Sequence, residues 1–475
     1  MHLPGTVRPL LTRFSRLLSL IGIPLGLVGG FLAVVNPLYF AVAFVAIAVT
    51  VCFFTNFEIT VITMLVFRST LDIFSGLPAA FALGLDVLIL AHITILFLTK
   101  QKIHIDKFWL IFAGWILAQG LWPVLTAVGG LGLGREYLGE SIREWIRIFS
   151  WVLVYLAINQ FKGRIHPERV ITGLFLALIL PLFVATLQLV FPAHALPTFL
   201  QAASDSVFES GSRINSTLGH PNTFVSFLIL FIGLTYWKIR QGKNSLAWGA
   251  LLLIEVFFLV STKALVGFPM LFVLFFIMII PQFRLRNLLG AVFVFVLLIA
   301  LFASTEFGRE RFATVLDTPL LNPNLTVNRA ILLSWFDTNS FNWRLAQWTF
   351  LIEEWKQAPL LGYGLGLASY LGPIRAYAHN DYVRVLVEGG VIGILLFLIF
   401  HTLQFIHLGR LYFSSLDASK KQFCLCLIAI FCSFLVGMIT ENIWTHTAFF
   451  FYWWTLFSMA NWDWSETDPN ASHSV

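Results

Sequence analysis

The sequence predicts an all-α integral membrane protein with about 12–14 transmembrane helices and a helical cap outside the membrane. Composition is the first observation: 58% of the 475 residues are hydrophobic and 11% are charged, whereas soluble domains carry about 25% charged residues. The second is the recurrence along the chain of apolar runs of roughly 17–25 residues, the length that crosses a bilayer. The third is a single long polar stretch, 305–384, between two such runs.

These runs divide the chain into four blocks. Residues 1–191 are expected to form an N-terminal transmembrane bundle, and 192–304 an outer loop followed by core helices. Residues 305–384 form a large loop or cap, and 385–475 the last helices and a tail. A loop of this length is too long for a plain connector, and we expect a helix near 343–357 within it. The predicted spans are about 17–36, 38–55, 57–72, 79–99, 108–128, 146–160, 170–191, 223–239, 246–262, 264–281, 287–304, 385–408, 422–440 and 444–461.

Positive charge gives these spans an orientation. More than half of the 30 Lys and Arg residues lie in the N-terminal segment and in loops near 100–107, 162–169, 238–243, 284–286 and 410–421. Short loops rich in Lys and Arg face the cytoplasm, so both termini are expected there. The two longest loops, 192–222 and 305–384, are separated by four spans and therefore share the opposite face.

His379 is the candidate catalytic residue. It lies in the sequence His379-Asn380-x9-Gly390-x-x-Gly393, where the long loop re-enters the membrane. An imidazole is suited to accept a proton near neutral pH, and the Asn380 amide is placed to orient a substrate. Gly390 and Gly393 are three residues apart, which predicts a shared helix face and close helix packing. The alternative is a loop histidine with only a structural role.

Arg213, Lys263 and Arg344 are candidate ligands for an anion. Arg213 precedes an apolar helix whose N-terminus favours negative charge, and Asn222 or Thr223 is expected to cap that helix. Lys263 lies on the outer side between two apolar runs, where a charge is costly and often functional. Arg344 flanks the predicted cap helix beside two Trp residues. The alternatives are a surface charge for Arg213, snorkelling for Lys263 and simple decoration of the helix for Arg344.

Arg375 and Arg384 bracket His379 and are expected to add a positive field around it. The sequence has no Asp-x-Asp segment and no group of His, Asp or Glu with the spacing of metal ligands. A metal-dependent enzyme that uses nucleotide sugars is therefore disfavoured, and we expect neither a metal ion nor a cofactor.

The motifs together resemble those of the bacterial O-antigen ligase and O-antigen polymerase family. The histidine sequence is similar to the family signature, and "RINSTLGHPNTFVSFL" to its Arg-containing segment. "STKALVG" resembles a boundary that usually carries Arg where this chain has Lys263, and "NWRLAQWTFLIEEWKQAPLLGYGLG" resembles the loop before the histidine. The resemblance covers about residues 205–400. Ile394 departs from the Gly, Thr or Tyr common in ligases and favours the polymerase, whereas the spacing of the histidine motif favours the ligase.

This resemblance implies a membrane-embedded, GT-C-like glycosyltransferase that is inverting and metal-independent. Its donor would be a glycan on undecaprenyl diphosphate, held by Arg213, Lys263 and Arg344. His379 would take the proton from an acceptor hydroxyl. The acceptor would be lipid A-core for a ligase, or the growing lipid-linked chain for a polymerase, in the synthesis of lipopolysaccharide or another surface polysaccharide.

The same resemblance implies a bacterial inner membrane setting, surrounded by membrane lipids, with the active site on the periplasmic face. We expect a monomer and no nucleic-acid partner. A secondary transporter is the alternative from another class, and a structural partner in an envelope assembly is a third. A transporter predicts broken helices and ionisable groups near the middle of the membrane, whereas the candidate charges here gather in outer loops.

Overall fold

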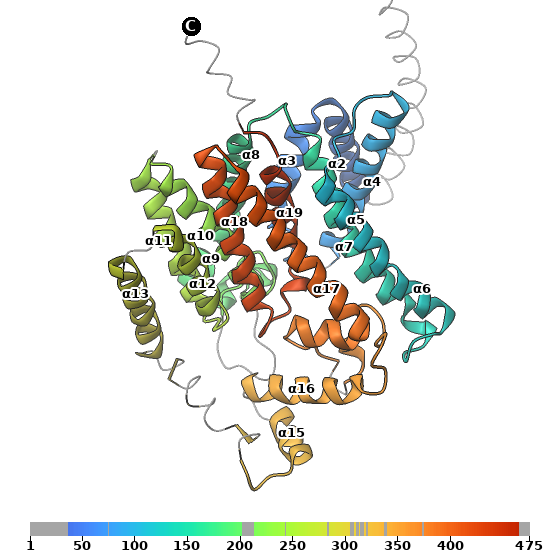
Figure 1. The fold of residues 1–475 in the computed structure, drawn as a ribbon, viewed down its shortest axis with the longest axis vertical. Coiled ribbons are helices and arrows are strands. Elements are labelled where there is room, and N and C mark those ends of the chain that lie inside the picture. The colour runs from blue at the N-terminus through green and yellow to red at the C-terminus, as the bar shows by residue number, and fades with distance from the viewer. Residues whose placement is uncertain are drawn as a thin grey trace, which may run out of the picture. The chain divides into compact units, whose positions relative to one another are not determined.

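In the computed structural model, helices are the only regular secondary structure among the described residues (Figure 1). This confirms the predicted all-α membrane fold. The chain divides into two compact units, Met1–Thr63 and Met64–Val475. The predicted span at 17–36 lies outside the described residues. The described residues are 37–74, 76–201, 213–242, 244–282, 285–304, 308–309, 313, 318–319, 322–336, 340–372 and 375–464.

Six segments in the described residues are long and apolar enough to cross a membrane, which makes the chain a multi-pass membrane protein. Side chains such as Leu98 on α4 and Ile399 on α17 are exposed, as lipid-facing residues are. The total of 12–14 spans stays a prediction. The six segments are α4 (Leu77–Leu98), α5 with α6 (Lys107–Gln119, Leu121–Val128), α8 with η2 and α9 (Pro167–Leu174, Phe175–Leu178, Ile179–Val190), α10 (Pro221–Arg240), α17 (Asp381–Ser414) and α18 (Ala418–Gly437).

The other helices complete the described part of the chain. Their bounds are α2 (Pro37–Thr55), α3 (Phe57–Arg68), η1 (Arg135–Tyr137), α7 (Leu138–Asn159), η3 (Ala193–Ala195), η4 (Thr198–Leu200), α11 (Ser245–Ser261), α12 (Gly267–Ile279), η5 (Ile280–Gln282), α13 (Leu285–Ser304), α15 (Val327–Phe336), α16 (Ser340–Trp355), η7 (Ala368–Tyr370), η8 (Ile443–Thr445) and α19 (Thr447–Ala460). The helix predicted near 343–357 is therefore present as α16.

The core of the second unit is built around α10 and α19. Helix α10 packs against α11, α12, α18 and α19, and α19 also packs against α7. Stacked aromatic rings join α19 to α7 and to α5: the ring centroids of Trp151 and Phe450 are 4.1 Å apart, and those of Phe112 and Trp454 are 4.0 Å apart. Such pairs add specific geometry to the burial of large apolar surfaces, so this core is a rigid base for the loops at its ends.

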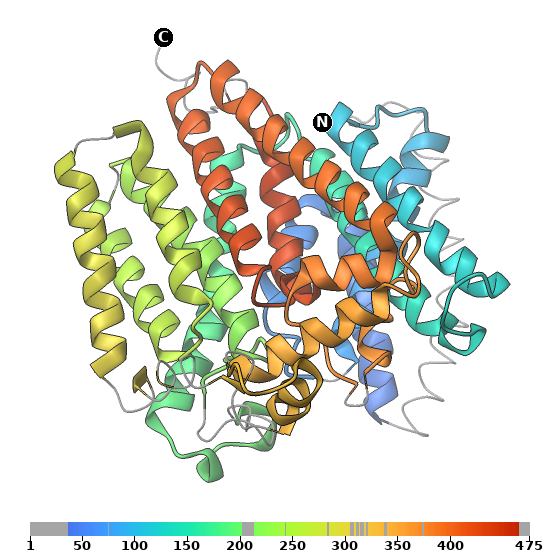
Figure 2. The same ribbon diagram turned by 60° about the horizontal axis from the view of Figure 1, so that its bottom comes forward.

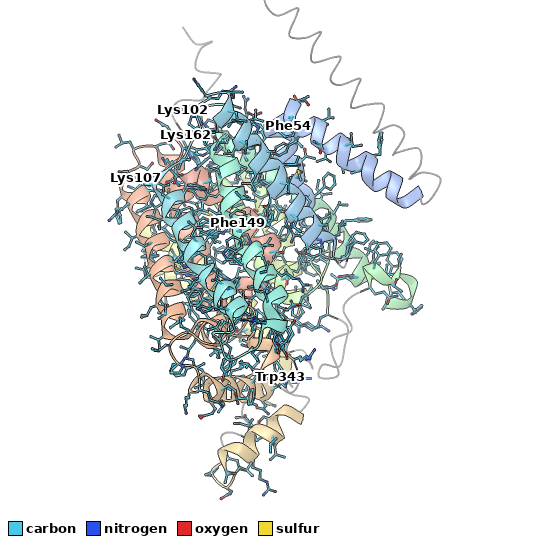
Figure 3. The ribbon with its side chains drawn as sticks, turned by 90° about the vertical axis from the view of Figure 1, so that its right-hand side faces the viewer. Phe54, Lys102, Lys107, Phe149, Lys162 and Trp343 are labelled. Atoms are coloured by element: carbon cyan, nitrogen blue, oxygen red, sulfur yellow. The ribbon has the colours of Figure 1, made fainter. Side chains whose placement is uncertain are left out.

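The cap and the basic loops lie at opposite ends of the second unit. Helix α16 runs across the end of α17 at which α17 begins (Figure 1), and Figure 2 shows the same cap segment at that end of α17 and α18. In Figure 3, Lys102, Lys107 and Lys162 gather at one end of the helices and Trp343 lies at the other. This matches the predicted separation of the Lys-rich loops from the cap.

Helix α17 is broken at Gly390, whose backbone has φ 62° and ψ −161°. The Gly-rich segment after α16 docks in this break. The N–H of Val391 donates to the carbonyl of Pro359 at 2.9 Å, and that of Ile392 donates to the carbonyl of Leu360 at 3.2 Å. A Cβ atom on Gly390 would lie only 2.3 Å from the Leu360 carbonyl group. Only glycine allows both this backbone conformation and this approach.

The prediction that Gly390 and Gly393 share one face of a regular helix is therefore wrong. Gly390 interrupts the helix to admit another backbone segment. Gly393 packs against the indole of Trp122, which an added Cβ would meet at 3.5 Å. Sequence spacing alone assumed helical geometry through Gly390, and a tertiary contact overrides it.

Replacing Gly390 with alanine is expected to destabilise the folded protein by about 2–4 kcal/mol, because strained backbone and steric overlap add. Thermal unfolding of the purified protein in detergent measures this. Gly84→Ala is the matched control, since a Cβ at Gly84 on α4 meets nothing within 4 Å. An unchanged melting temperature for Gly390→Ala would contradict the proposed reason for this glycine.

Candidate active site

The loop that carries His379 is fixed at both sides. The Asn380 side chain caps α17, because its Oδ1 accepts hydrogen bonds from the N–H groups of Tyr382 and Val383, both at 3.0 Å. His379 itself has φ 48°, a left-handed conformation that is uncommon for residues other than glycine. The N–H of Asp381 donates to the carbonyl of Met438 at 2.9 Å. These contacts hold the imidazole in one position against the end of α18.

His379 faces a buried carboxylate. Its Nδ1 lies 3.1 Å from Oε1 of Glu441, whose side chain is 4% exposed. Burial alone would raise the pKa of Glu441, but the facing imidazole of His379, with His220 and Arg344, holds that pKa well below its usual range. A charged carboxylate accepts a hydrogen bond from Nδ1–H, which leaves Nε2 of His379 with its lone pair free to accept a proton.

The cap helix α16 supplies the outer wall of this pair. Nη2 of Arg344 lies 3.9 Å from Oε2 of Glu441, a distance at which the two charges attract without a short hydrogen bond. The ring of Trp343 meets the His379 ring edge-on, with centroids 5.6 Å apart. Both neighbours come from the segment predicted to lie in the cap, so the cap contributes directly to the surroundings of His379.

Arg213 reaches the same pair through Asn222. Arg213 is 7% exposed, and its Nη2 donates to Oδ1 of Asn222 at 3.3 Å. The Nδ2 of Asn222 in turn donates to Oε2 of Glu441. Residues far apart in the sequence therefore form one polar chain from Arg213 to His379.

Lys263 is placed beside this chain by the loop between α11 and α12. The Nε of Arg213 donates to the carbonyl of Thr262 at 3.1 Å, and Lys263 is the next residue, exposed and with φ 55°. The structure thus gathers the segments of the three predicted anion ligands around His379. Their roles in binding stay a prediction.

Two expectations about neighbouring residues are corrected. His220, rather than Asn222 or Thr223, caps α10: its Nδ1 accepts from the N–H of Asn222 at 3.2 Å. Burial of this imidazole lowers its pKa, which suits the neutral acceptor that a cap requires. Because His220 satisfies the helix end, the Asn222 side chain is released to bridge Arg213 and Glu441.

Arg375 and Arg384 also have other partners than the expected ones. The Nη2 and Nε of Arg384 donate to Glu144 at 2.7 Å and to Glu388 at 2.9 Å. Arg375 is exposed and lies over the ring of Tyr370, 5.8 Å from its centroid. Both arginines therefore interact with other residues. The prediction that they add a positive field around His379 does not account for these contacts.

Glu441 is the functional candidate that sequence reasoning missed. A signal was available: it is a carboxylate in "MITENIW", between the last two apolar runs. Alternation of the spans puts this short connection on the same face as His379. An acidic residue at that place is a natural partner for the imidazole, although only the fold shows the contact.

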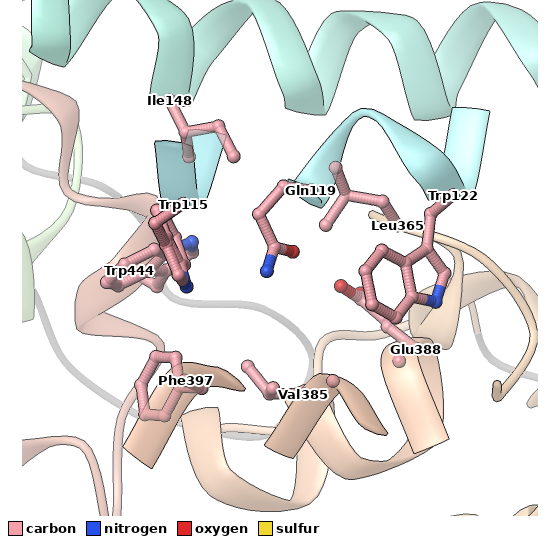
Figure 4. A pocket seen from close by; sticks show the side chains of 11 residues that line it. Trp115, Gln119, Trp122, Ile148, Leu365, Val385, Glu388, Phe397 and Trp444 are labelled. Carbon is pink, nitrogen blue, oxygen red and sulfur yellow. The ribbon is translucent and has the colours of Figure 1, made fainter. Parts of the chain in front are cut away.

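A small cavity behind the break in α17 is too small to take a glycan. Figure 4 shows Gln119 and Glu388 reaching into the space between Trp115 and Trp122. Its volume is about 20 Å³, which has room for about one water molecule. The Nε1 of Trp115 is buried there without a protein partner, so a water is the natural occupant.

Among the described residues, no group of three His, Cys, Asp or Glu side chains is arranged to hold a metal ion.

The fold and the site define a multi-pass helical membrane protein with a buried carboxylate–imidazole pair and clustered cations at one end of its helices. Residues 247–398 match the family model described as O-antigen ligase. This part of the chain is therefore similar to the O-antigen ligase family. The matched region includes Lys263, Arg344 and His379, whereas Arg213 and Glu441 lie outside it.

A Rickettsia conorii protein described as "Putative polysaccharide ligase" is also similar to this chain. The two are 29% identical over 127 residues, which is 23% of this chain and 28% of the Rickettsia protein. The similarity thus spans less than a third of the relative, and it supports the family rather than a particular substrate.

Proposed function

We propose that this protein transfers a glycan from undecaprenyl diphosphate to an acceptor hydroxyl on the periplasmic face of the bacterial inner membrane. The observation that carries the proposal is the polar chain from Arg213 through Asn222 and Glu441 to His379. It places a proton acceptor and fixed positive charge in one site, as a reaction needs when it consumes a hydroxyl proton and releases a diphosphate. The match of residues 247–398 to the O-antigen ligase family model supports this reaction class.

In this mechanism Nε2 of His379 removes the proton as the acceptor oxygen attacks the anomeric carbon. The bond from that carbon to the diphosphate oxygen breaks, and undecaprenyl diphosphate leaves with the electron pair. Attack on the face opposite to the leaving group inverts the configuration. Glu441 stabilises the imidazolium that forms.

The departing diphosphate gains negative charge in the transition state. Arg213 and Lys263 come from the loops before α10 and between α11 and α12, and Arg344 comes from α16, so these three cations would stabilise the charge that develops. A donor that already carries a diphosphate needs no nucleotide, which fits a reaction outside the cytoplasm. The same geometry serves a ligase and a polymerase, because both acceptors present a hydroxyl.

The broken helix α17 does not favour the transporter alternative. A helix of 34 residues is about 51 Å long, whereas the hydrocarbon core is about 30 Å thick. The part after Gly390 alone is about 36 Å long and is sufficient to cross the membrane. The break then falls at the cap end of the span rather than at the midplane, where a transporter places its broken helices.

The product identifies the acceptor and tests the proposal. Purified protein is incubated with glycan on undecaprenyl diphosphate, with and without lipid A-core. Glycan joined to lipid A-core indicates a ligase, and longer glycan still on the diphosphate carrier indicates a polymerase. Absence of both products from a folded protein, with each acceptor supplied, would overturn the proposed reaction.

Arg213→Ala is expected to lower kcat/KM for the lipid-linked donor by roughly 10–100-fold, the effect of losing a hydrogen bond to a charged group. Arg213→Lys should lose less, because it keeps the charge but not the planar guanidinium. Steady-state rates at varied donor concentration measure both, with Arg329→Ala as the control at an exposed cap arginine. Equal losses for the two Arg213 variants would argue against a diphosphate contact.

Transfer is expected to continue in EDTA. Lys and Arg side chains supply the positive charge that a divalent ion gives to a diphosphate in metal-dependent enzymes. Initial rates are compared in EDTA and after addition of Mg²⁺ or Mn²⁺. Loss of activity in EDTA that either ion restores would refute metal independence.

A further inference from the structure

A second polar cavity lies between α4, α7 and the segment that follows α16. Its volume is about 520 Å³, within the range of sites for small molecules. Its described lining includes none of His379, Glu441, Asn222 and Arg213. It is therefore distinct from the candidate active site.

Arginines dominate the charged lining of this cavity. Four of them, Arg68, Arg143, Arg147 and Arg384, face two carboxylates, Glu140 and Glu144. Arg68 and Arg384 are 1% and 2% exposed, so their guanidinium groups have lost most of their hydration. The lining itself thus carries more positive than negative charge, while Asp72 and Glu388 behind it pair with Arg68 and Arg384, and Arg143 at its edge is exposed.

The hydrogen-bonding capacity of these guanidinium groups is only partly used. Nη1 of Arg68 donates to Asp72 at 2.8 Å, and Nη2 of Arg384 donates to Glu144 at 2.7 Å. Yet Nε of Arg68, Nε of Arg147 and Nη1 of Arg384 are each buried without a partner. Native proteins rarely leave several buried donors unsatisfied around one site. A ligand with several anionic oxygens would satisfy such donors after small rotations of the side chains.

The other wall of the cavity is apolar and continues toward the lipid. Leu83 on α4 and Ile142 on α7 line it and are 48% and 41% exposed. Further along α4, Val87 and Leu90 are also exposed, on a helix long and apolar enough to span the membrane. A charged cavity that opens onto such a face suits an amphiphile, with an anionic headgroup among the arginines and hydrocarbon along α4.

The cavity and the candidate active site lie close together along the chain. Thr447 lines the cavity and accepts a hydrogen bond from Arg68, six residues after Glu441. Arg384 lies one helical turn after Asp381, which accepts a hydrogen bond from the N–H of Trp444 at 2.8 Å. The segment 441–447 thus runs from the candidate active site to the cavity, and Arg384 lines the cavity one turn into the helix that follows His379.

We propose that this cavity binds the phosphate-bearing headgroup of a second lipid substrate, the glycolipid that presents the acceptor hydroxyl to His379. This assignment rests on the proposed glycan transfer, because it gives each of the two lipid substrates its own cluster of cations. The donor diphosphate lies with Arg213, Lys263 and Arg344, and the acceptor phosphate lies with Arg68, Arg147 and Arg384.

Binding stoichiometry tests the second site without requiring activity. Full-length protein in detergent is titrated with undecaprenyl diphosphate, and native mass spectrometry counts the bound molecules. Wild-type protein is expected to bind two. Arg147→Gln and Arg213→Ala are each expected to bind one, and the double variant none. Arg147→Gln leaves Glu144 paired with Arg384, so the fold retains its buried ion pair.

Two further variants separate the cavity from general effects of charge. Ala82→Phe fills the cavity from α4 without changing a charge and is expected to remove the same single molecule as Arg147→Gln. Arg135→Gln changes an exposed arginine outside the cavity and should leave two molecules bound. Two bound molecules in both Arg147→Gln and Ala82→Phe would overturn the second site.

Competition distinguishes the source of the phosphate. Phosphatidylglycerol and inorganic phosphate are added separately to the Arg213→Ala protein, which retains the cavity. Undecaprenyl diphosphate is expected to stay bound against a tenfold excess of either. If phosphatidylglycerol displaces undecaprenyl diphosphate, the cavity is a site for bulk lipid. If inorganic phosphate displaces it, the hydrocarbon tail has no role in binding.

Kinetics then separates this inference from the proposed function. Arg147→Gln is expected to raise the KM for the acceptor lipid at least tenfold and to leave the KM for the donor unchanged. Unchanged acceptor KM with normal transfer would overturn the acceptor site while glycan transfer stands. Absence of transfer by wild-type protein would instead overturn the proposed function, and the acceptor assignment with it.

Discussion

Replacing His379 is expected to reduce kcat for glycan transfer by about 10²–10⁴-fold, the usual contribution of a general base. Asparagine is the most informative substitution, because it tolerates the left-handed backbone at this position but cannot accept the proton. Alanine removes the ring altogether and should give a loss of similar size. Initial rates at saturating donor and acceptor measure both.

The His379 variants need a measure of folding beside the rate. His194→Ala is the matched control, since His194 is exposed in the short helix η3 and its loss should leave kcat unchanged. Melting temperatures near that of the wild type would assign the effect to chemistry. A folded His379→Asn protein with the wild-type kcat would contradict the general-base role.

Glu441→Gln is expected to slow transfer by roughly 10²–10⁴-fold, in the range seen when the carboxylate that orients a catalytic histidine is lost. The amide keeps the size of the side chain and still offers an oxygen to His379. It lacks the charge that stabilises the imidazolium, so the acid limb of the rate profile should move to lower pH. The measurement is kcat/KM for transfer from pH 5 to 9, with Glu353→Gln on the exposed face of α16 as the control.

The lowered pKa of Glu441 also determines the pH range in which its own carboxylate is charged. Its pKa is held well below the usual value, so the carboxylate stays charged down to acid pH, and the stabilisation that it gives its cationic neighbours is lost only as the pH falls through the lowered pKa. Glu441 therefore contributes no titration to the rate profile near neutrality. A wild-type rate and an unshifted acid limb in Glu441→Gln would show that the 3.1 Å contact with His379 has no part in catalysis.

Hydropathy was sufficient to predict the helices that carry the site. The apolar runs before and after the outer loops gave the positions of α10 and α17, and the Trp-rich stretch gave α16. The positive-inside pattern placed Lys102 and Lys162 away from Trp343, as the structure does. These predictions hold because each depends on local composition and the requirement to satisfy the backbone within the membrane.

The contacts that make the site were not predictable in the same way. Glu441 is 62 residues from His379 and 219 from Asn222, so their proximity depends on the packing of α10, α17 and α18. The cap by His220 and the break at Gly390 each replace a local preference with a tertiary contact. The cavity arginines depend equally on the fold, because Arg147 and Arg384 come from separate helices.

The central claim is that His379 and Glu441 drive an inverting transfer from undecaprenyl diphosphate. The most direct test uses purified protein and a lipid-linked donor of known anomeric configuration, and follows released undecaprenyl diphosphate together with the configuration of the new linkage. We predict one diphosphate carrier released for each glycan transferred, an inverted linkage, and a rate at least 10²-fold lower in His379→Asn. A retained configuration, or full transfer by the folded variant, would contradict the account.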